Sequence, residues 1–301
     1  MKKNYGKIFK ELRLSKGYSI KEISGTEISN ATISKFEHGN TMLSIDKFFR
    51  VLSNINVSPR EFFLYAEERL ENPYLSISKD FLPFEEKKIN IEKLQKAIIL
   101  LEEQLCEYPK RTFLRVQIIT YKVIMSKAFP DSPNNIAPQD LQLIERYLFG
   151  IKNWSEVELR IYCATIHLFD IDIIKTLTYR LISPLSYRLI TPDIRWMMAI
   201  AIMSVIDAIL PRHKNCLKEN ELFNEINKYL RENPIPDRYT AEKGFVKFNM
   251  GSFQYLSGKT IVGEQVMRDV IEAFTLIDCN VYSRLLIIKF EKVTGRAYLK
   301  V

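Results

Sequence analysis

The sequence predicts an all-α protein with two domains. Apolar residues recur every three or four positions through most of the chain, which is the spacing of one helix face. No stretch of useful length alternates between apolar and polar residues as a half-buried strand would. The length of 301 residues suits two domains better than one, and most prolines fall between the helical segments.

Positive charge is concentrated at the start of the chain. Residues 1–60 contain eight Lys and three Arg against four Glu and one Asp, so their net charge is 11 − 5 = +6, whereas the whole chain carries +8. Such an excess in a small segment favours a polyanionic partner such as nucleic acid. The alternative is an ordinary basic surface.

The sequence shows no sign of membrane insertion or metal binding. Its first residues are charged throughout, and its most apolar stretch, Trp196–Leu210, is interrupted by Ser204 and Asp207. The four cysteines lie far apart without a CxxC pair, and His38 has no ligand cluster near it. We therefore expect a cytoplasmic protein with reduced thiols, no membrane partner, no metal and no cofactor.

The first three helices are predicted from caps and apolar spacing. The first covers residues 5–16, and a capping box of Ser19 and Glu22 starts a short second helix. Ser29 is a suitable N-cap for the third helix, which has Ile33 and Phe36 on its buried side. Gly39 is expected to end it.

Two further helices complete the predicted N-terminal domain. The fourth begins near Ser44, and four of its residues are expected to be buried: Ile45, Phe48, Phe49 and Leu52. The fifth has three start signals, which are Ser58 at the N-cap, Pro59 at the first position and Glu61 at the third.

The third helix leaves small polar side chains on its outer face. Two short helices joined by a tight turn inside a five-helix unit describe a helix-turn-helix domain, in which the second helix enters the DNA major groove. The groove is about 12 Å wide and admits a helix whose leading side chains are slim. Asn30, Ala31, Thr32, Ser34 and Lys35 meet this requirement, and such side chains pair with base edges or thymine methyl groups.

Residues 5–64 resemble the helix-turn-helix domain of the Cro/C1-type (Xre) family. The matching residues are Leu12-Arg13, Lys16-Gly17, Ser29, Ile33-Ser34, Phe36-Glu37, Gly39, Val57-Ser58 and Phe62. The resemblance implies base contacts from Asn30, Ala31, Thr32 and Lys35. It implies phosphate contacts from Ser29, Ser34, His38 and Asn40.

The same resemblance makes two further points. It implies that Arg13 and Glu37 form a structural ion pair rather than a contact with DNA. Family members commonly have Gln at the start of the second helix, where it grips a phosphate, but this chain has Ile20. An alternative for the whole segment is a five-helix protein-binding module that has lost DNA binding.

A helical domain is predicted after a linker. We place the helix-turn-helix domain at residues 1–66, the linker at 67–83 and the helical domain at 84–301. Ten amphipathic segments start near residues 84, 111, 138, 155, 171, 193, 219, 239, 260 and 280. Pairs beginning near 111, 155, 193, 239 and 280 have the rhythm of a solenoid of helical hairpins.

Residues 248–278, "FNMGSFQYLSGKTIVGEQVMRDVIEAFTLID", resemble a tetratricopeptide repeat. Gly251 permits close packing of the second helix in that motif, Gly258 falls at the turn, and Gly263 stands where Ala is usual. The second helix is expected to bury Val262, Val266, Met267, Val270 and Phe274. The predicted architecture is therefore a helix-turn-helix domain followed by a right-handed superhelix of tetratricopeptide-like hairpins.

The concave face of such a superhelix suits an extended peptide. Asn249 lies on the helix face that lines the groove in tetratricopeptide repeats, although it is also placed to cap or bridge neighbouring helices. Cations and a tyrosine among the apolar helices are further candidates for contact with a peptide carboxylate, with surface or inter-helix pairing as the alternative. They are Arg160, Tyr162, Arg180, Arg188 and Arg195.

The order of the two domains resembles the Rgg/MutR-type regulators, which are quorum-sensing regulators of Gram-positive bacteria. "SISKDF" after the linker and "IKNWSEVEL" at 151–159 add to the likeness. The resemblance implies a homodimer that binds double-stranded promoter DNA at an inverted repeat, and a short signalling peptide that alters transcription. The last helix, residues 281–293, is a candidate for either the dimer face or the cap of the solenoid.

Two rival functions remain open. One is a DNA-binding repressor that needs no ligand and whose helical domain serves only dimerisation or protein contacts. The other is a hydrolytic enzyme with Cys163 and His167 at helical i, i+4 spacing. The sequence has no Gly-rich phosphate loop, GxSxG or HExxH motif, so we expect no enzymatic activity.

Overall fold

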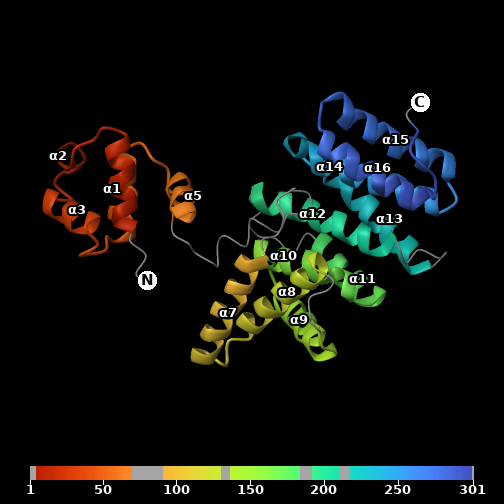
Figure 1. The fold of residues 1–301 in the computed structure, drawn as a ribbon, viewed down its shortest axis with the longest axis horizontal. Coiled ribbons are helices and arrows are strands. Elements are labelled where there is room, and N and C mark those ends of the chain that lie inside the picture. The colour runs from red at the N-terminus through yellow and green to blue at the C-terminus, as the bar shows by residue number, and fades with distance from the viewer. Residues whose placement is uncertain (1–4, 70–90, 130–135, 184–191, 211–216, 300–301) are drawn as a thin grey trace. The chain divides into compact units, whose positions relative to one another are not determined.

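The computed structural model describes residues 5–69, 91–129, 136–183, 192–210 and 217–299. It divides the chain into two compact units, Met1–Leu82 and Pro83–Val301. Every regular element among the described residues is helical, which confirms the all-α prediction (Figure 1). The predicted linker lies mostly outside the described residues, as do the first part of the helix predicted from residue 84 and Arg188.

Among its described residues, the first unit has five helices around one apolar core. They are α1 (Tyr5–Ser15), α2 (Ile20–Ile23), α3 (Asn30–Glu37), α4 (Ile45–Asn54) and α5 (Pro59–Arg69). Helix α1 supplies Ile8, Phe9 and Leu12 to the core, and α3 supplies Ile33 and Phe36. Each such side chain contributes on the order of 1.5–3 kcal/mol when fully buried.

The predicted caps are present in this unit. Ser19 and Glu22 form the capping box that starts α2, and the Ser29 hydroxyl accepts the Thr32 N–H at the start of α3. Ser58 and Glu61 exchange the equivalent pair of hydrogen bonds before α5. Gly39 has φ +75° and ends α3 in the left-handed conformation that glycine adopts most readily.

The expected burial of α4 is partly wrong. Ile45 and Phe49 are 66% and 42% exposed, whereas Val51 and Leu52 are fully buried. Ile45 lies at the first position of the helix, and Phe49 lies one turn later on the same side. The core is reached instead by Phe48 and by the pair Val51 and Leu52, so the apolar stripe of α4 is wider than its buried face.

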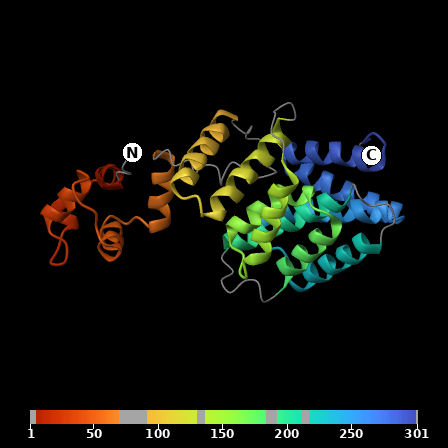
Figure 2. The same ribbon diagram turned by 90° about the horizontal axis from the view of Figure 1, so that it is seen from below.

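The second unit contains ten α-helices among its described residues. They are α7 (Ile91–Glu107), α8 (Thr112–Ala128), α9 (Pro138–Gly150), α10 (Glu156–Thr165), α11 (Ile171–Ile182), α12 (Pro192–Ile209), α13 (Leu217–Glu232), α14 (Thr240–Leu256), α15 (Thr260–Leu276) and α16 (Asn280–Thr294). Helix α8 packs on α10, α10 on α12, α12 on α14 and α14 on α16. This row is the succession of hairpin-starting helices that the sequence predicts (Figures 1 and 2).

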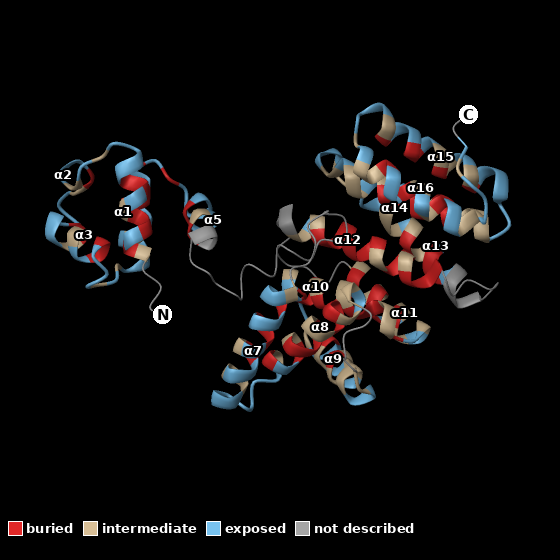
Figure 3. Cartoon of the chain, viewed as in Figure 1, coloured by how far each residue is buried: buried red, intermediate tan, exposed pale blue. Residues whose placement is uncertain are grey.

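Helix α12 lies at the centre of the row. Almost every described side chain from Met197 to Leu210 is buried, because α12 contacts α10, α11, α13 and α14 (Figure 3). The most apolar stretch of the sequence is therefore a core helix, as expected. Among the described residues, no helix has the length and apolar character needed to cross a membrane.

Helices α14 and α15 cross at two glycines. A Cβ atom added to Gly251 would lie 2.9 Å from the Gly263 carbonyl oxygen, and one added to Gly263 would lie 2.4 Å from the Tyr255 backbone nitrogen. This confirms that Gly251 permits close packing, and it explains why the usual Ala is absent at residue 263. Val262 is 56% exposed, so its expected burial is wrong; it lies one position before the crossing and points outward. Val266, also expected to be buried, is half-buried.

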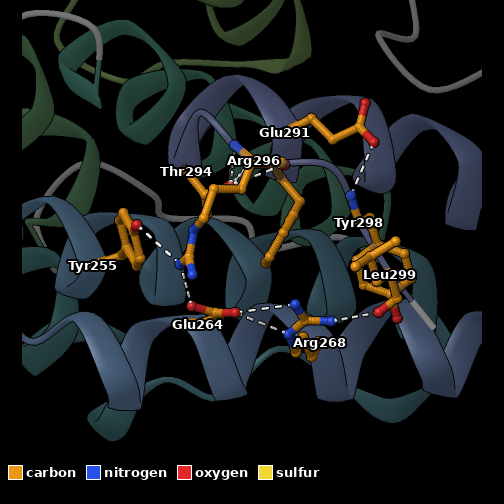
Figure 4. Close-up of polar contacts among 9 residues, drawn as sticks. Tyr255, Glu264, Arg268, Glu291, Thr294, Arg296, Tyr298 and Leu299 are labelled. Carbon is orange, nitrogen blue, oxygen red and sulfur yellow. Dashed lines mark hydrogen bonds and ion pairs between the residues drawn. The ribbon is translucent and has the colours of Figure 1, made fainter. Parts of the chain in front are cut away.

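The end of the chain is fastened to α15 and α16 by a polar network (Figure 4). Glu264 accepts hydrogen bonds from Arg268 at 3.1 Å and from Arg296 at 2.5 Å. Arg268 also donates to the Leu299 carbonyl oxygen at 2.9 Å. Its guanidinium group lies over the rings of Phe290 and Tyr298. Tyr298, in the segment after Thr294, packs edge-on against Phe290, and their ring centroids lie 5.4 Å apart.

Candidate DNA-binding and ligand sites

The outer face of α3 is polar and accessible. Asn30, Ala31 and Lys35 are exposed and Thr32 is half-buried, whereas Ile33 and Phe36 on the opposite side are 0% and 2% exposed. All four residues predicted to contact bases therefore lie on one short helix, on the side away from the core. Their side chains are slim enough for a helix to enter a major groove.

The residues predicted to contact phosphates lie at the two ends of α3. Ser29 is exposed, and its hydroxyl oxygen lies 3.0 Å from that of Thr32. Ser34 is half-buried, and its carbonyl oxygen accepts the His38 backbone N–H at 3.1 Å. His38 and Asn40 are exposed after the last turn. The N-terminal end of α3, at Ser29, also offers free backbone N–H donors to an anion.

A buried ion pair fixes α3 against α1. Arg13 donates two parallel hydrogen bonds to the Glu37 carboxylate, from Nε at 2.6 Å and from Nη2 at 2.9 Å. The two side chains are 5% and 1% exposed, so the pair is removed from water. Arg13 also donates to the Tyr18 carbonyl oxygen at 2.5 Å. The structural ion pair implied by the family resemblance is thus confirmed.

The close approach of α1 to α3 requires Gly6. A Cβ atom at this residue would lie 1.7 Å from the Phe36 carbonyl oxygen, which no side-chain rearrangement relieves. Ile20, where the related domains commonly have Gln, is half-buried and packs against the core. The side chain at this position therefore supports the core, and the family's phosphate anchor is absent from it.

Two contacts that hold the turn before α3 were not foreseen from the sequence. Arg50 of α4 forms an ion pair with Glu27 at 2.9 Å. Asn54 donates its side-chain amide to the Ile23 carbonyl oxygen at 2.8 Å. Both contacts join residues more than twenty positions apart, so no local pattern signals them. They link α4 to the turn between α2 and α3, which sets the orientation of α3 relative to α2.

Asn249 bridges three helices of the second unit. Its side chain is fully buried, donates to Asp207 of α12 at 2.9 Å and accepts from Lys289 of α16 at 2.8 Å. Lys289 also donates to Asp207. Asp207 and Lys289 are 38% and 28% exposed. The bridging role considered for Asn249 is therefore observed, and a peptide contact stays a prediction for this group.

The other candidate peptide contacts have structural partners. Tyr162 is fully buried, and its hydroxyl lies 2.8 Å from that of Thr178, so this side chain belongs to the core rather than to an open groove. Arg160 forms an ion pair with Glu156 one turn earlier. Arg180 donates to the Phe149 and Ile151 carbonyl oxygens at the end of α9. These are the pairings inside and between helices that the sequence left as the alternative.

Two candidate peptide contacts remain, Arg195 and Arg188. Arg195 is exposed on α12, and Arg188 is outside the described residues. Among the described residues, no group of three or more His, Cys, Asp or Glu side chains has the arrangement of a metal site.

Cys163 lacks the properties of a catalytic nucleophile. Burial raises the pKa of its thiol to about 12, and a hydrogen bond with Ser204 only partly offsets this. The thiolate is the reactive form of cysteine, so such a thiol is largely inert at neutral pH. His167 lies in a separate 3-10 turn, Ile166–Leu168, beyond the end of α10. The pair therefore offers no support for hydrolysis.

Two family models match the chain. Residues 9–62 match a helix-turn-helix family, which defines the class of protein to which the first unit belongs. Residues 98–285 match the family described as "HTH-type transcriptional regulator Rgg, C-terminal domain". Because this second match spans more than half of the 301 residues, the chain belongs to the Rgg family of helix-turn-helix transcriptional regulators.

Solved structures share the fold over nearly the whole length. The Streptococcus dysgalactiae SHP pheromone receptor Rgg2 aligns over 96% of this chain and 100% of its own, with a TM-score of 0.68 and 17% identity. A Listeria monocytogenes EGD-e protein aligns over 97% of both chains, with a TM-score of 0.69 and 17% identity. The PrgX/cCF10 complex aligns over 99% of this chain and 94% of its own, with a TM-score of 0.64 and 14% identity.

Proposed function

We propose that this Rgg-family regulator binds duplex DNA through α3 and that a short signalling peptide bound to its second unit modulates the binding. The observation that carries the DNA-binding part is the slim polar face of α3, held rigidly against α1 by the buried pair of Arg13 and Glu37. The positive charge of residues 1–60 supplies the attraction to the phosphate backbone.

The residues of α3 take different roles in this proposal. Asn30, Ala31, Thr32 and Lys35 approach base edges and determine sequence preference. Ser29, Ser34, His38 and Asn40 contact phosphates and set the position of the helix on the duplex. Lys35 lies near the end of the helix, where its long side chain reaches a guanine or a phosphate.

Substitution of the base-contacting residues tests these roles. We expect Asn30→Ala and Lys35→Ala to weaken binding to the preferred duplex by about 1–3 kcal/mol each, with a smaller loss on random DNA. Lys152→Ala removes the same charge from an exposed position in the second unit and should leave both affinities unchanged. An equal loss on preferred and random duplexes would argue against direct base contacts.

Two observations support the proposed peptide binding: the row of packed helices in the second unit, and the similar proteins described above. The names of two similar structures describe a pheromone receptor and a complex with cCF10. In this chain, α12, α14 and α16 share the group of Asp207, Asn249 and Lys289, in which Asn249 is buried and the two charged side chains are partly exposed. Its carboxylate and ammonium are complementary to the N–H and C=O groups of an extended peptide.

A thermal-shift screen with synthetic short peptides tests peptide binding. A peptide present at 100 times its dissociation constant stabilises the folded protein by about 2.7 kcal/mol. We expect the shift to shrink in Asp207→Asn and to persist in Asp172→Asn, which changes a carboxylate on the first turn of α11. A screen without any stabilising peptide, repeated with fractions of culture medium, would favour the ligand-independent repressor instead.

We further propose that the protein acts as a homodimer on an inverted repeat. One small helix-turn-helix unit makes few phosphate contacts, and a two-fold pair doubles them with half-sites about 34 Å apart. On α16, Leu285 and Ile288 are 43% and 65% exposed and lie on one side of the helix. Ile288→Glu should shift the protein toward monomer in sedimentation experiments, whereas Lys292→Glu at an exposed polar position should not.

A further inference from the structure

His38 is held in one tautomer by the end of α3. Its Nδ1 lies 2.7 Å from the Ser34 carbonyl oxygen, and the imidazole is exposed. A carbonyl oxygen only accepts hydrogen bonds, so Nδ1 must carry the proton of this contact. In a neutral imidazole the other nitrogen, Nε2, then has a lone pair and no proton.

This arrangement restricts how His38 contacts DNA. Phosphate oxygens accept hydrogen bonds and carry negative charge. Neutral His38 therefore offers no ring donor to a phosphate, whereas protonated His38 offers both the Nε2–H and a positive charge. We propose that His38 is a proton-dependent phosphate contact, so that DNA binding takes up a proton at this residue and strengthens as the pH falls.

The surroundings of His38 favour this reading, which depends on the proposed DNA-binding function. The residue lies at the C-terminal end of α3, where a positive charge is stabilised by the helix carbonyls. Helices α1 and α2 pack against α3, and Phe48 of α4 contacts Phe36 of α3. The charged residues of these four helices are Lys7, Lys10, Glu11, Arg13, Lys21, Glu22, Lys35, Glu37, Asp46, Lys47 and Arg50.

Three of the four carboxylates on these helices have other partners. Glu37 is bound by Arg13, Glu22 caps α2, and Glu11 has an interaction of its own. The fourth, Asp46, lies in the first turn of α4. His38 Nδ1 contacts a backbone carbonyl rather than a carboxylate. A DNA phosphate is therefore the anion that a protonated His38 gains on binding.

The experiment compares three full-length proteins across pH. Wild type, His38→Gln and His38→Arg are titrated by fluorescence anisotropy into one duplex, which wild type selects from a random-sequence pool. Measurements run from about pH 6 to about pH 8.5, a range over which histidine is the side chain that commonly changes charge. At each pH the affinity is measured at several salt concentrations.

Wild type should bind severalfold more tightly at the acidic end than at the basic end. Its salt dependence, the slope of log affinity against log salt, should also be steeper there by about 0.9, the value of one additional phosphate contact. His38→Arg carries a permanent charge and should bind tightly with the steeper slope throughout. His38→Gln should keep the shallower slope and lose the wild-type dependence on pH.

Other results would overturn the inference. If His38→Gln or His38→Arg retains the wild-type pH dependence, the proton is taken up elsewhere. Salt-sensitive binding that does not change with pH in wild type would also reject the role of His38, while leaving DNA binding intact. Absence of duplex binding at every pH would overturn the proposed function itself, and this inference with it.

Discussion

The ion pair of Arg13 and Glu37 is the contact on which the position of α3 most depends. Both charges are removed from water, and each satisfies the other through two hydrogen bonds. Removal of one partner leaves an uncompensated buried charge, which typically costs about 3–5 kcal/mol. We therefore predict that Arg13→Met destabilises the first unit by this amount and weakens DNA binding without removing any residue that contacts DNA.

Hydrogen exchange measured on peptides from α3 checks this prediction. Both tryptophans, Trp154 and Trp196, lie in the second unit, so their fluorescence does not report on α3. Arg50→Met serves as the control, because its pair with Glu27 is more than half exposed and such pairs contribute at most about 1 kcal/mol. Equal acceleration of exchange in the two variants would contradict the assigned importance of the buried pair.

At the scale of single residues, the sequence predicts caps better than tertiary partners. Ser19, Ser29 and Ser58 act as predicted because a cap depends on residues three positions away. The partners of Arg180 and Asn249 lie more than 28 positions away. Such pairings depend on how helices pack, and a single sequence does not contain that information locally.

At the scale of elements, nearly every helix begins close to its predicted start, because proline, caps and apolar spacing agree with one another. Helix α4 shows the limit of this reasoning. Its apolar residues cover too many sides for periodicity to select the buried one, and Ile45 and Phe49 are exposed as a result. The buried face of α4 is determined by tertiary contacts instead. Helix α4 packs on α5, and the ring of Phe48 contacts the rings of Phe36 and Phe62.

The crossing of α14 and α15 leaves no room for a methyl group at Gly263. The Cβ of Gly263→Ala would meet backbone atoms of Tyr255 and Gly251 at 2.4 and 2.5 Å, so one helix must move. Overpacking of this kind costs about 1–3 kcal/mol. Denaturant unfolding followed by tryptophan fluorescence should show this loss of stability in the second unit.

Gly150→Ala provides the matched control for the crossing. A Cβ atom at Gly150 would meet nothing within 4 Å, and the residue lies at the end of α9. The change should therefore be neutral or stabilise the helix by up to about 1 kcal/mol. A Gly263→Ala protein as stable as the control would show that the two helices do not cross this closely.

The chain end should make the second unit sensitive to acid. Burial acts to raise the pKa of Glu264, but hydrogen bonds from Arg268 and Arg296 outweigh it and hold the pKa below its ordinary value. A lowered carboxyl pKa contributes stability that is fully present above the unfolded value and is lost as pH falls through the folded value. Glu264→Gln lacks this contribution at every pH.

The predicted result is a stability difference between wild type and Glu264→Gln that is constant above about pH 5 and narrows below the ordinary glutamate pKa. Tryptophan fluorescence during denaturant unfolding measures the difference at each pH. Glu103→Gln, at an exposed position of α7, should differ from wild type by the same small amount throughout. A difference for Glu264→Gln that does not change with pH would contradict the network of Figure 4.

At the scale of the whole molecule, two kinds of helical architecture are combined in one chain. The first unit is specified mainly by local signals, namely caps and glycines, and has one small apolar core. Its fold and candidate DNA-binding face therefore follow closely from the sequence. The second unit is specified by successive packing of α8, α10, α12, α14 and α16. Its helices are predictable from the sequence, whereas the residues available to a ligand depend on how the helices pack. Tyr162, for example, was a candidate ligand contact but is buried in the core.

The central claim is that α3 of an intact regulator enters duplex DNA with the help of a basic surface. Its most direct measurement is the affinity of full-length wild type for a duplex selected from a random pool, determined over a range of salt concentrations. We predict that log affinity falls linearly with log salt, with a slope of about −0.9 for each phosphate contacted. Absence of salt-sensitive affinity for any duplex would contradict it.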